Sequence, residues 1–140
     1  MSTKWSISFD IKQIQTPGNW ACVFLSTATD SGAKDIGYRI PSVHIGGNDE
    51  ILIYTSTNDS PIQYFQTKIR LNVYVSVVIQ QRYVSAGKYR LSVFKDGEEF
   101  GSVINENAKI FHDVKMYRCN PYLGPPSKAY VKNLKFTNFL

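Results

Sequence analysis

The stretch 94–100, FKDGEEF, holds the densest group of acidic residues in the 140-residue chain. Asp96, Glu98 and Glu99 place three carboxylates within four positions. Two carboxyl groups about 5 to 10 Å apart, one of them with a raised pKa, can cleave a glycosidic bond by acid and base catalysis. The stretch is therefore either a catalytic carboxylate cluster or an acidic tight turn.

The local pattern favours the turn. Asp96-Gly97 lies between two runs of alternating apolar and polar residues. A two-residue type I′ turn needs positive φ at both central positions, which Asp and Gly tolerate best. Glu98 and Glu99 then begin the return strand, where neighbouring side chains point to opposite faces. The two glutamates therefore do not aim at one bond, and the sequence predicts a hairpin.

Nucleophile and metal motifs are missing from the sequence. No G-x-S-x-G stretch accompanies His44 or His112, the two histidines. Cys22 and Cys119 do not form the C-x-x-C pair that holds zinc. They are either two buried thiols or the two halves of one disulfide. The sequence thus predicts no enzyme.

The composition is that of a soluble globular protein, with 43% hydrophobic and 19% charged residues. Its length favours a single domain over residues 1–140. The net charge is +5, but Lys and Arg are scattered, so no nucleic-acid partner is expected. No apolar run approaches the roughly 20 residues that span a bilayer, so no membrane insertion is expected. The first ten residues lack the plan of a signal peptide, which leaves the location open.

Alternation of apolar and polar residues, the period of a β-strand, runs through nearly the whole chain. About ten or eleven strands separated by turn signals predict an all-β antiparallel sandwich. Pro41 indicates an edge or a bulge, and residues 105–111 are the one helical candidate. Trp5 and Trp20 are expected in the core. The predicted strands are 5–11, 20–27, 38–45, 50–56, 62–67, 70–81, 88–94, 101–105, 113–119 and 129–139.

The order of segments resembles the concanavalin A-like, laminin G-like jelly-roll domains of the lectin-like superfamily, over almost the whole length. The resemblance rests on WSISFDIKQ, on LNVYVSVVIQQ followed by GKYRLSVFKDGEEF, and on AYVKNLKF. It implies a two-sheet jelly roll in which 129–136 lies beside 5–11. Glycosidases of that superfamily carry an E-x-D-x-x-E pattern, which this sequence lacks. The resemblance also implies glycans or glycoproteins as partners and an extracellular or secreted location.

Sugar recognition needs an aromatic face and planar polar side chains, and loops of sandwiches often carry such sites. Two stretches hold these residue types. Either can instead be structural, since the first can brace a strand edge and the prolines of the second can stiffen a surface connection. Tyr122 is the first choice for stacking on a sugar ring. The candidates are Asp35, Tyr38 and Arg39 in 30–39, and Arg118, Asn120 and Tyr122 in 118–126.

The sequence therefore predicts a noncatalytic, lectin-like module that binds glycans through surface loops. Because single weak sites gain from multiplicity, a homo-oligomer fits this function. The alternative is an extracellular adhesion or structural module that binds another protein, which a large exposed apolar patch would favour. No cofactor is predicted. The acidic residues near 30–35 and 48–50 suit calcium in type but not in spacing.

Overall fold

The computed structural model describes residues 1–30, 32, 34–119 and 125–139. This part of the chain forms ten strands and contains no helix, so the predicted helical turn at 105–111 is wrong. Within it, nothing helical is long and apolar enough to cross a membrane. The strands are β1 (Trp5–Gln13), β2 (Ala21–Thr27), β3 (Ser42–Gly46), β4 (Glu50–Thr57), β5 (Ser60–Lys68), β6 (Tyr74–Ser85), β7 (Lys88–Lys95), β8 (Glu98–Asn105), β9 (Lys115–Tyr117) and β10 (Ala129–Asn138).

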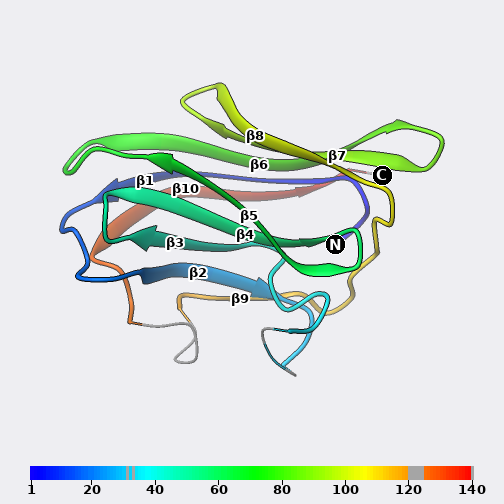
Figure 1. The fold of residues 1–140 in the computed structure, drawn as a ribbon, viewed down its shortest axis with the longest axis horizontal. Helices are drawn as coiled ribbons and strands as arrows, with labels where there is room; N and C mark the ends of the chain where they lie inside the picture. Colours follow the sequence, from blue (N-terminus) through cyan, green and yellow to red (C-terminus); the bar gives the residue numbers. More distant parts are fainter. Residues whose placement is uncertain (31, 33, 120–124, 140) are drawn as a thin grey trace.

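The strands form two antiparallel sheets that face each other. Sheet A has the order β10-β1-β6-β7-β8 and sheet B the order β5-β4-β3-β2-β9. In Figure 1 the strands of both sheets run roughly along the longest axis of the molecule. The predicted all-β, two-sheet sandwich is confirmed.

The first and last strands are neighbours in sheet A, as predicted. β1 pairs antiparallel with β10, from Trp5 opposite Asn138 to Gln13 opposite Ala129. A bulge between Ser8 and Asp10 interrupts the register. The two ends of the chain therefore lie at the same end of the sandwich (Figure 1).

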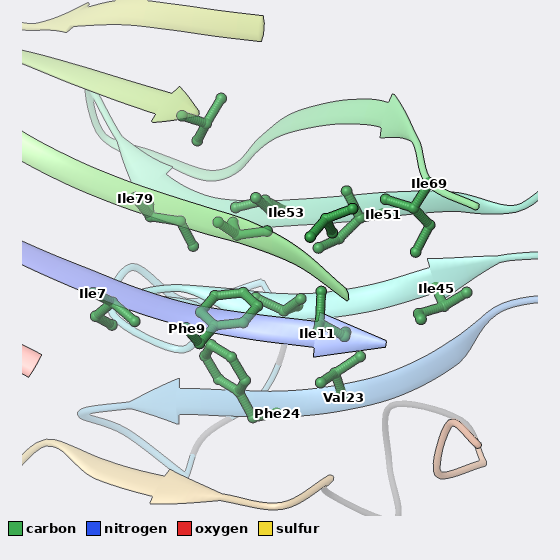
Figure 2. Close-up of a cluster of buried hydrophobic side chains, with 14 of the residues drawn as sticks. Ile7, Phe9, Ile11, Val23, Phe24, Ile45, Ile51, Ile53, Ile69 and Ile79 are labelled. Carbon is green, nitrogen blue, oxygen red and sulfur yellow. The ribbon is translucent and has the colours of Figure 1, made fainter. Parts of the chain in front are cut away.

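The core lies between the two sheets and follows the alternation of β1. Every second residue of β1, from Trp5 to Gln13, is buried. Figure 2 shows Phe9 from sheet A and Phe24 from sheet B meeting at the centre of the cluster. Their rings contact edge to face, with centroids 5.2 Å apart. Isoleucines and valines from both sheets surround this pair (Figure 2).

Two expectations for sheet B are resolved. Of the alternatives for Pro41, the edge is wrong, because β3 begins directly after Pro41 and is the central strand of the sheet. The bulge fits, because Ser26 accepts from the Ile40 amide and donates to the Pro41 carbonyl, so that two residues face one. Trp20 is not in the core: it is 38% exposed. β2 begins one residue later, at Ala21, so Trp20 precedes the strand and its ring lies against His44.

The acidic stretch is a hairpin, as predicted. Asp96 and Gly97 have φ values of 49° and 81°, and they connect β7 to β8. The Asp96 carboxylate accepts a hydrogen bond from the Ser76 amide at 2.9 Å. Glu99 forms an ion pair with Arg90 at 2.6 Å, and Glu98 is exposed. These carboxylates therefore stabilise the turn and the strand rather than converge on a substrate.

Gly97→Val is expected to lower the free energy of unfolding by about 1 to 2 kcal/mol, because a β-branched residue is strained at positive φ. The space around Gly97 is open, so backbone strain is the sole cause. Urea denaturation measures the loss. Replacing exposed Glu98 with Gln is the control and should change stability by less than about 0.5 kcal/mol. An equal loss in both variants would contradict the assigned turn.

The two long sides of the sandwich differ. On one side β5 approaches β8, and Phe65 packs so closely on Gly101 that a Cβ atom there would clash with its ring. On the other side the edge strands are β9 and β10. β9 has three residues and β10 has ten. Most of β10 therefore extends beyond the strand that could cover it.

Candidate functional site

Residues 37–41 continue the line of β3 between β2 and β4. The Ile40 amide donates to the Ser26 carbonyl at 2.9 Å, and the Ser26 amide donates to the Pro41 carbonyl at 2.8 Å. The Ser56 amide on β4 donates to the Arg39 carbonyl at 2.8 Å. Backbone hydrogen bonds to strands on both sides thus fix Arg39 in the middle of sheet B.

Four aromatic side chains form a row across sheet B, from the start of β2 to β5. We call Trp20, His44, Tyr54 and Tyr64 the aromatic row. Neighbouring ring centroids lie 5.0 Å apart for Trp20 and His44, 5.3 Å for His44 and Tyr54, and 5.9 Å for Tyr54 and Tyr64. The ends of the row are open to solvent, with Trp20 38% and Tyr64 56% exposed. The row therefore offers ring surface to a ligand.

Arg39 adds a cation to the aromatic row. Its guanidinium lies 5.0 Å from the ring centroid of Tyr54. Among the described residues, the buried Nε atom has no hydrogen-bond partner, and no side-chain hydrogen bond or ion pair occupies the guanidinium. A planar guanidinium binds carboxylates and neighbouring hydroxyls through paired hydrogen bonds. Arg39 is therefore available to an anionic or polyhydroxylated ligand.

His44 is the buried member of the aromatic row. Desolvation, together with a smaller effect of the positive charge of Arg39, lowers the pKa of His44 to about 4. One ring nitrogen, Nε2, lies 3.2 Å from the Ser42 hydroxyl, while Nδ1 has no hydrogen-bond partner in the described part of the chain. His44 is thus neutral at neutral pH, so Arg39 supplies the charge of the site.

The structure separates the residues predicted in 30–39. Tyr38 is buried and packs against Leu25, so its ring has no open face for a sugar and its contribution is to hold the neighbouring Arg39. Asp35 is exposed in a turn, where its carbonyl accepts from the Tyr38 amide at 3.2 Å. Arg39 is the member of this group that reaches the aromatic row.

The predicted site in 118–126 is described only in part, because Asn120 and Tyr122 lie outside the described residues. Arg118 lines a hollow of about 530 Å³ on the open side of the sandwich, between β2, β9 and β10. Cys22 and Cys119 also line it, and no disulfide joins these two described residues. The Cys119 sulfur lies 2.6 Å from the Cys22 carbonyl oxygen. Most of the lining is apolar, which suits a sugar less well than the aromatic row does.

Three of the acidic residues considered for calcium have protein partners. Asp49 accepts hydrogen bonds from Gln13 at 2.9 Å and from Thr16 at 2.5 Å. Glu50 pairs with Lys68 at 3.4 Å and Asp30 with Lys115 at 3.7 Å. Within residues 1–119 and 125–139, apart from positions 31 and 33, no cluster of three His, Cys, Asp or Glu side chains is placed to hold a metal ion.

Hydrogen bonds lower the pKa values of the carboxylates whose titration is clearly shifted. For Asp10 the main cause is the Ser76 hydroxyl, followed by Asn133. For Glu99 it is Arg90. Asp59 and Glu106 shift down mainly through hydrogen bonds from Lys109 and Lys88. A general acid needs a pKa that is raised, so these four groups suit structural roles.

Sequence reasoning missed all four residues of the aromatic row, although one signal was present. Tyr54 and Tyr64 lie five positions on either side of Asp59, in the turn that joins β4 to β5. Residues equally distant from a hairpin turn face each other, and these two tyrosines are paired in the register. Trp20 and His44 carry no such signal, because their contact depends on the pairing of β2 with β3.

Comparison with solved structures identifies the fold. A heptameric SAP-like pentraxin from Limulus polyphemus superposes with a TM-score of 0.54 at 14% identity, over 96% of this chain and 63% of that chain. The chain has the concanavalin A-like fold. The resemblance seen in the sequence is confirmed at this level, and the concanavalin A-like sandwich extends over nearly all of the chain.

Two further neighbours share the concanavalin A-like fold. One is botulinum neurotoxin type C, in a structure that describes its interaction with two ganglioside molecules. It superposes with a TM-score of 0.61 at 12% identity, and the match covers 95% of this chain and 32% of that chain. The other is the CBM40 of the Ruminococcus gnavus IT-sialidase, bound to α2,3-sialyllactose. It superposes with a TM-score of 0.59 at 12% identity, and the match covers 95% of this chain and 74% of that chain. The chain thus spans less than two thirds of the pentraxin and about a third of the toxin chain. The sequence matches no family model and no curated protein.

Proposed function

We propose that the protein is a noncatalytic carbohydrate-binding module that recognises glycans ending in an acidic sugar. The observation that carries the proposal is the Arg39 guanidinium, which has no hydrogen-bond or ion-pair partner among the described residues and lies 5.0 Å from Tyr54. Arg39 binds the carboxylate of the sugar, and the exposed ring of Tyr64 contacts its apolar face. The net charge of +5 favours the approach of an anionic glycan.

The neighbours in fold support this ligand class. Their structures include a CBM40 bound to α2,3-sialyllactose, a toxin that interacts with gangliosides, and a Trypanosoma rangeli sialidase in complex with the inhibitor DANA. Because the sialidase is an enzyme, the fold alone does not decide between binding and hydrolysis. The downward pKa shifts of Asp10, Asp59, Glu99 and Glu106 favour binding, since hydrolysis needs a carboxyl group with a raised pKa.

A glycan ligand agrees with an extracellular or secreted location and with glycoprotein partners. The site lies on the surface of sheet B rather than in a deep pocket, so a single site binds weakly. A homo-oligomer that presents several copies of the site gains avidity without new contacts.

Arg39→Gln is expected to weaken binding of α2,3-sialyllactose at least about tenfold, a loss of roughly 1.4 kcal/mol. The reason is that the variant keeps a polar side chain but loses the charge and the paired donors. Tyr64→Ala is expected to cause a similar loss through the missing ring face. Isothermal titration calorimetry with α2,3-sialyllactose and with lactose measures both effects and the contribution of the acidic sugar.

The matched controls are Arg82→Gln and Tyr83→Ala, which remove an exposed arginine and an exposed tyrosine from sheet A. Neither is expected to alter binding. Equal affinity for lactose and sialyllactose would remove the acidic sugar from the proposal. A glycan array without any bound glycan, or release of sialic acid from the trisaccharide, would contradict the proposed function itself.

A further inference from the structure

β10 is an edge strand, and no strand of the described residues pairs with its outer edge. It pairs with β1 on one side and ends sheet A on the other. The unpaired amide and carbonyl groups of such an edge are a template for another strand. At ten residues, β10 is long for an edge strand. Its backbone therefore offers room for an added strand.

The inner face of β10 is apolar but not covered. Val131, Leu134 and Phe136 are 38%, 45% and 41% exposed. Their cross-strand neighbours on β1 show what full coverage would be, since Ile11 opposite Val131 and Ile7 opposite Phe136 are completely buried. The sandwich core thus continues to the last strand and remains open there.

The hollow on this side is an extension of the core. Its lining joins Val23 and Phe24 of sheet B to Val131 and Leu134 of sheet A, with Met116 of β9 between them. Continuous apolar surface of this kind marks an interaction site in a soluble protein. Alternate side chains of an added strand would enter the hollow from the free edge of β10.

The charges around β10 indicate the chemistry of that strand. Lys132 and Lys135 lie opposite Asp10 and Ser8 in the register and so project from the outer face of sheet A. Lys128 comes directly before the strand, and Arg118 lines the hollow. None of the described residues that line the hollow is acidic. A partner strand therefore gains from acidic side chains on the face that does not enter the hollow.

A second copy of the chain is a poor partner for this edge. Antiparallel pairing of two β10 strands around their centres would bring Lys132 and Lys135 of one copy against the same lysines of the other. Like charges directly opposite each other destabilise strand pairing. Acidic side chains at these positions convert the repulsion into ion pairs.

We propose that the open side of the sandwich binds an extended segment of a partner protein in which apolar and acidic residues alternate. The segment pairs with the free edge of β10, its apolar side chains fill the hollow beside Leu134, and its acidic side chains contact Lys132 and Lys135. This is strand addition, a common mode of peptide recognition. The site involves neither Arg39 nor the aromatic row, so it does not depend on the proposed glycan site.

The test uses a labelled peptide of alternating valine and glutamate, and the same peptide with lysine in place of glutamate. Fluorescence anisotropy with the full chain is expected to show binding of the glutamate peptide and at least about tenfold weaker binding of the lysine peptide. Lys132→Gln/Lys135→Glu is expected to reverse that preference. Glutamine at position 132 avoids a new carboxylate beside Asp10, whose pKa Lys132 helps to lower.

Leu134→Ser is expected to weaken the binding of both peptides. Hydrogen exchange of the β10 amides is expected to slow when the glutamate peptide binds.

Urea denaturation checks the folding of each variant. It also compares Val131→Ala with Val93→Ala, a matched pair from the inner face of sheet A. The exposed valine is expected to cost less stability than Val93, which is fully buried. Equal costs would contradict an open edge at β10.

Two results would overturn the proposal. The first is the absence of binding of the glutamate peptide up to about 1 mM, which is the weakest affinity of interest. The second is a dimer in sedimentation experiments that Leu134→Ser dissociates, because it would assign this edge to a second copy of the chain.

Discussion

A fall of about 3 kcal/mol in the free energy of unfolding is expected as the pH decreases from 6.5 to about 4, because of His44. Burial keeps this histidine neutral in the folded protein down to about pH 4. In the unfolded chain it takes up a proton near its ordinary pKa of 6.5. Between pH 6.5 and about 4, proton binding therefore favours the unfolded state. The contribution of neutral His44 to the free energy of unfolding is fully present only above pH 6.5.

Urea denaturation at a series of pH values measures this loss. His44→Gln is expected to abolish the slope between pH 6.5 and about 4.5, since glutamine does not titrate. The four carboxylates with lowered pKa values have ordinary values of 3.8 to 4.5. Their contribution is lost at lower pH, below the interval that reports on His44.

The control is His112→Gln, because His112 is exposed. Its replacement is expected to leave the slope unchanged. If the wild-type protein showed no slope above pH 4.5, or if His112→Gln removed it, the buried neutral state of His44 would be refuted.

Phe9→Ala is expected to lower the free energy of unfolding by about 3 to 5 kcal/mol, the range for removing a buried aromatic ring. Phe9 is 2% exposed and sits in the middle of the core. The cavity would open between the sheets, where the ring contacts Phe24 (Figure 2). Chemical denaturation measures the loss, and Ile62→Ala on β5, where the side chain is exposed, is the control.

A double-mutant cycle separates the ring pair from the burial of each ring. Edge-to-face aromatic pairs contribute roughly 0.5 to 1.5 kcal/mol beyond their buried area. Phe9→Leu, Phe24→Leu and the double variant are therefore expected to show a coupling of that size. Strictly additive losses would mean that the two rings act only as separate apolar volumes.

The fold was predictable because alternation marks a strand wherever one face is buried and the other is wet. β1 shows this most clearly, since Ile7, Phe9 and Ile11 alternate with Ser8 and Asp10. The Asp96-Gly97 hairpin was equally clear, because few residues accept positive φ. The start of β6 was harder to predict from the sequence. Val73 continues the apolar period of that strand but is exposed, because the strand begins at Tyr74, after a turn in which Asn72 has a φ of 59°.

The candidate site was less predictable because it depends on contacts between strands that are distant in sequence. Arg39 was identified from its residue type and its loop. Its neighbour Tyr54 is brought beside it by the pairing of β3 with β4, and Trp20 reaches His44 through the pairing of β2 with β3. Trp20 was expected in the core because large apolar residues are usually buried, whereas its position one residue before β2 leaves it exposed.

The pairing of β1 with β10 also determines when the molecule can become native. Trp5 pairs with Gln81 on one side and with Asn138 on the other, so β1 receives its second neighbour in sheet A only after β10, more than a hundred positions later in the chain, has been synthesised. The hairpins β4–β5, β6–β7 and β7–β8 join segments that are adjacent in sequence and form early, since short loops close at a low entropic cost. Sheet A is completed only when β10 joins β1, and until then the apolar face of β1 is exposed to aggregation or to chaperones.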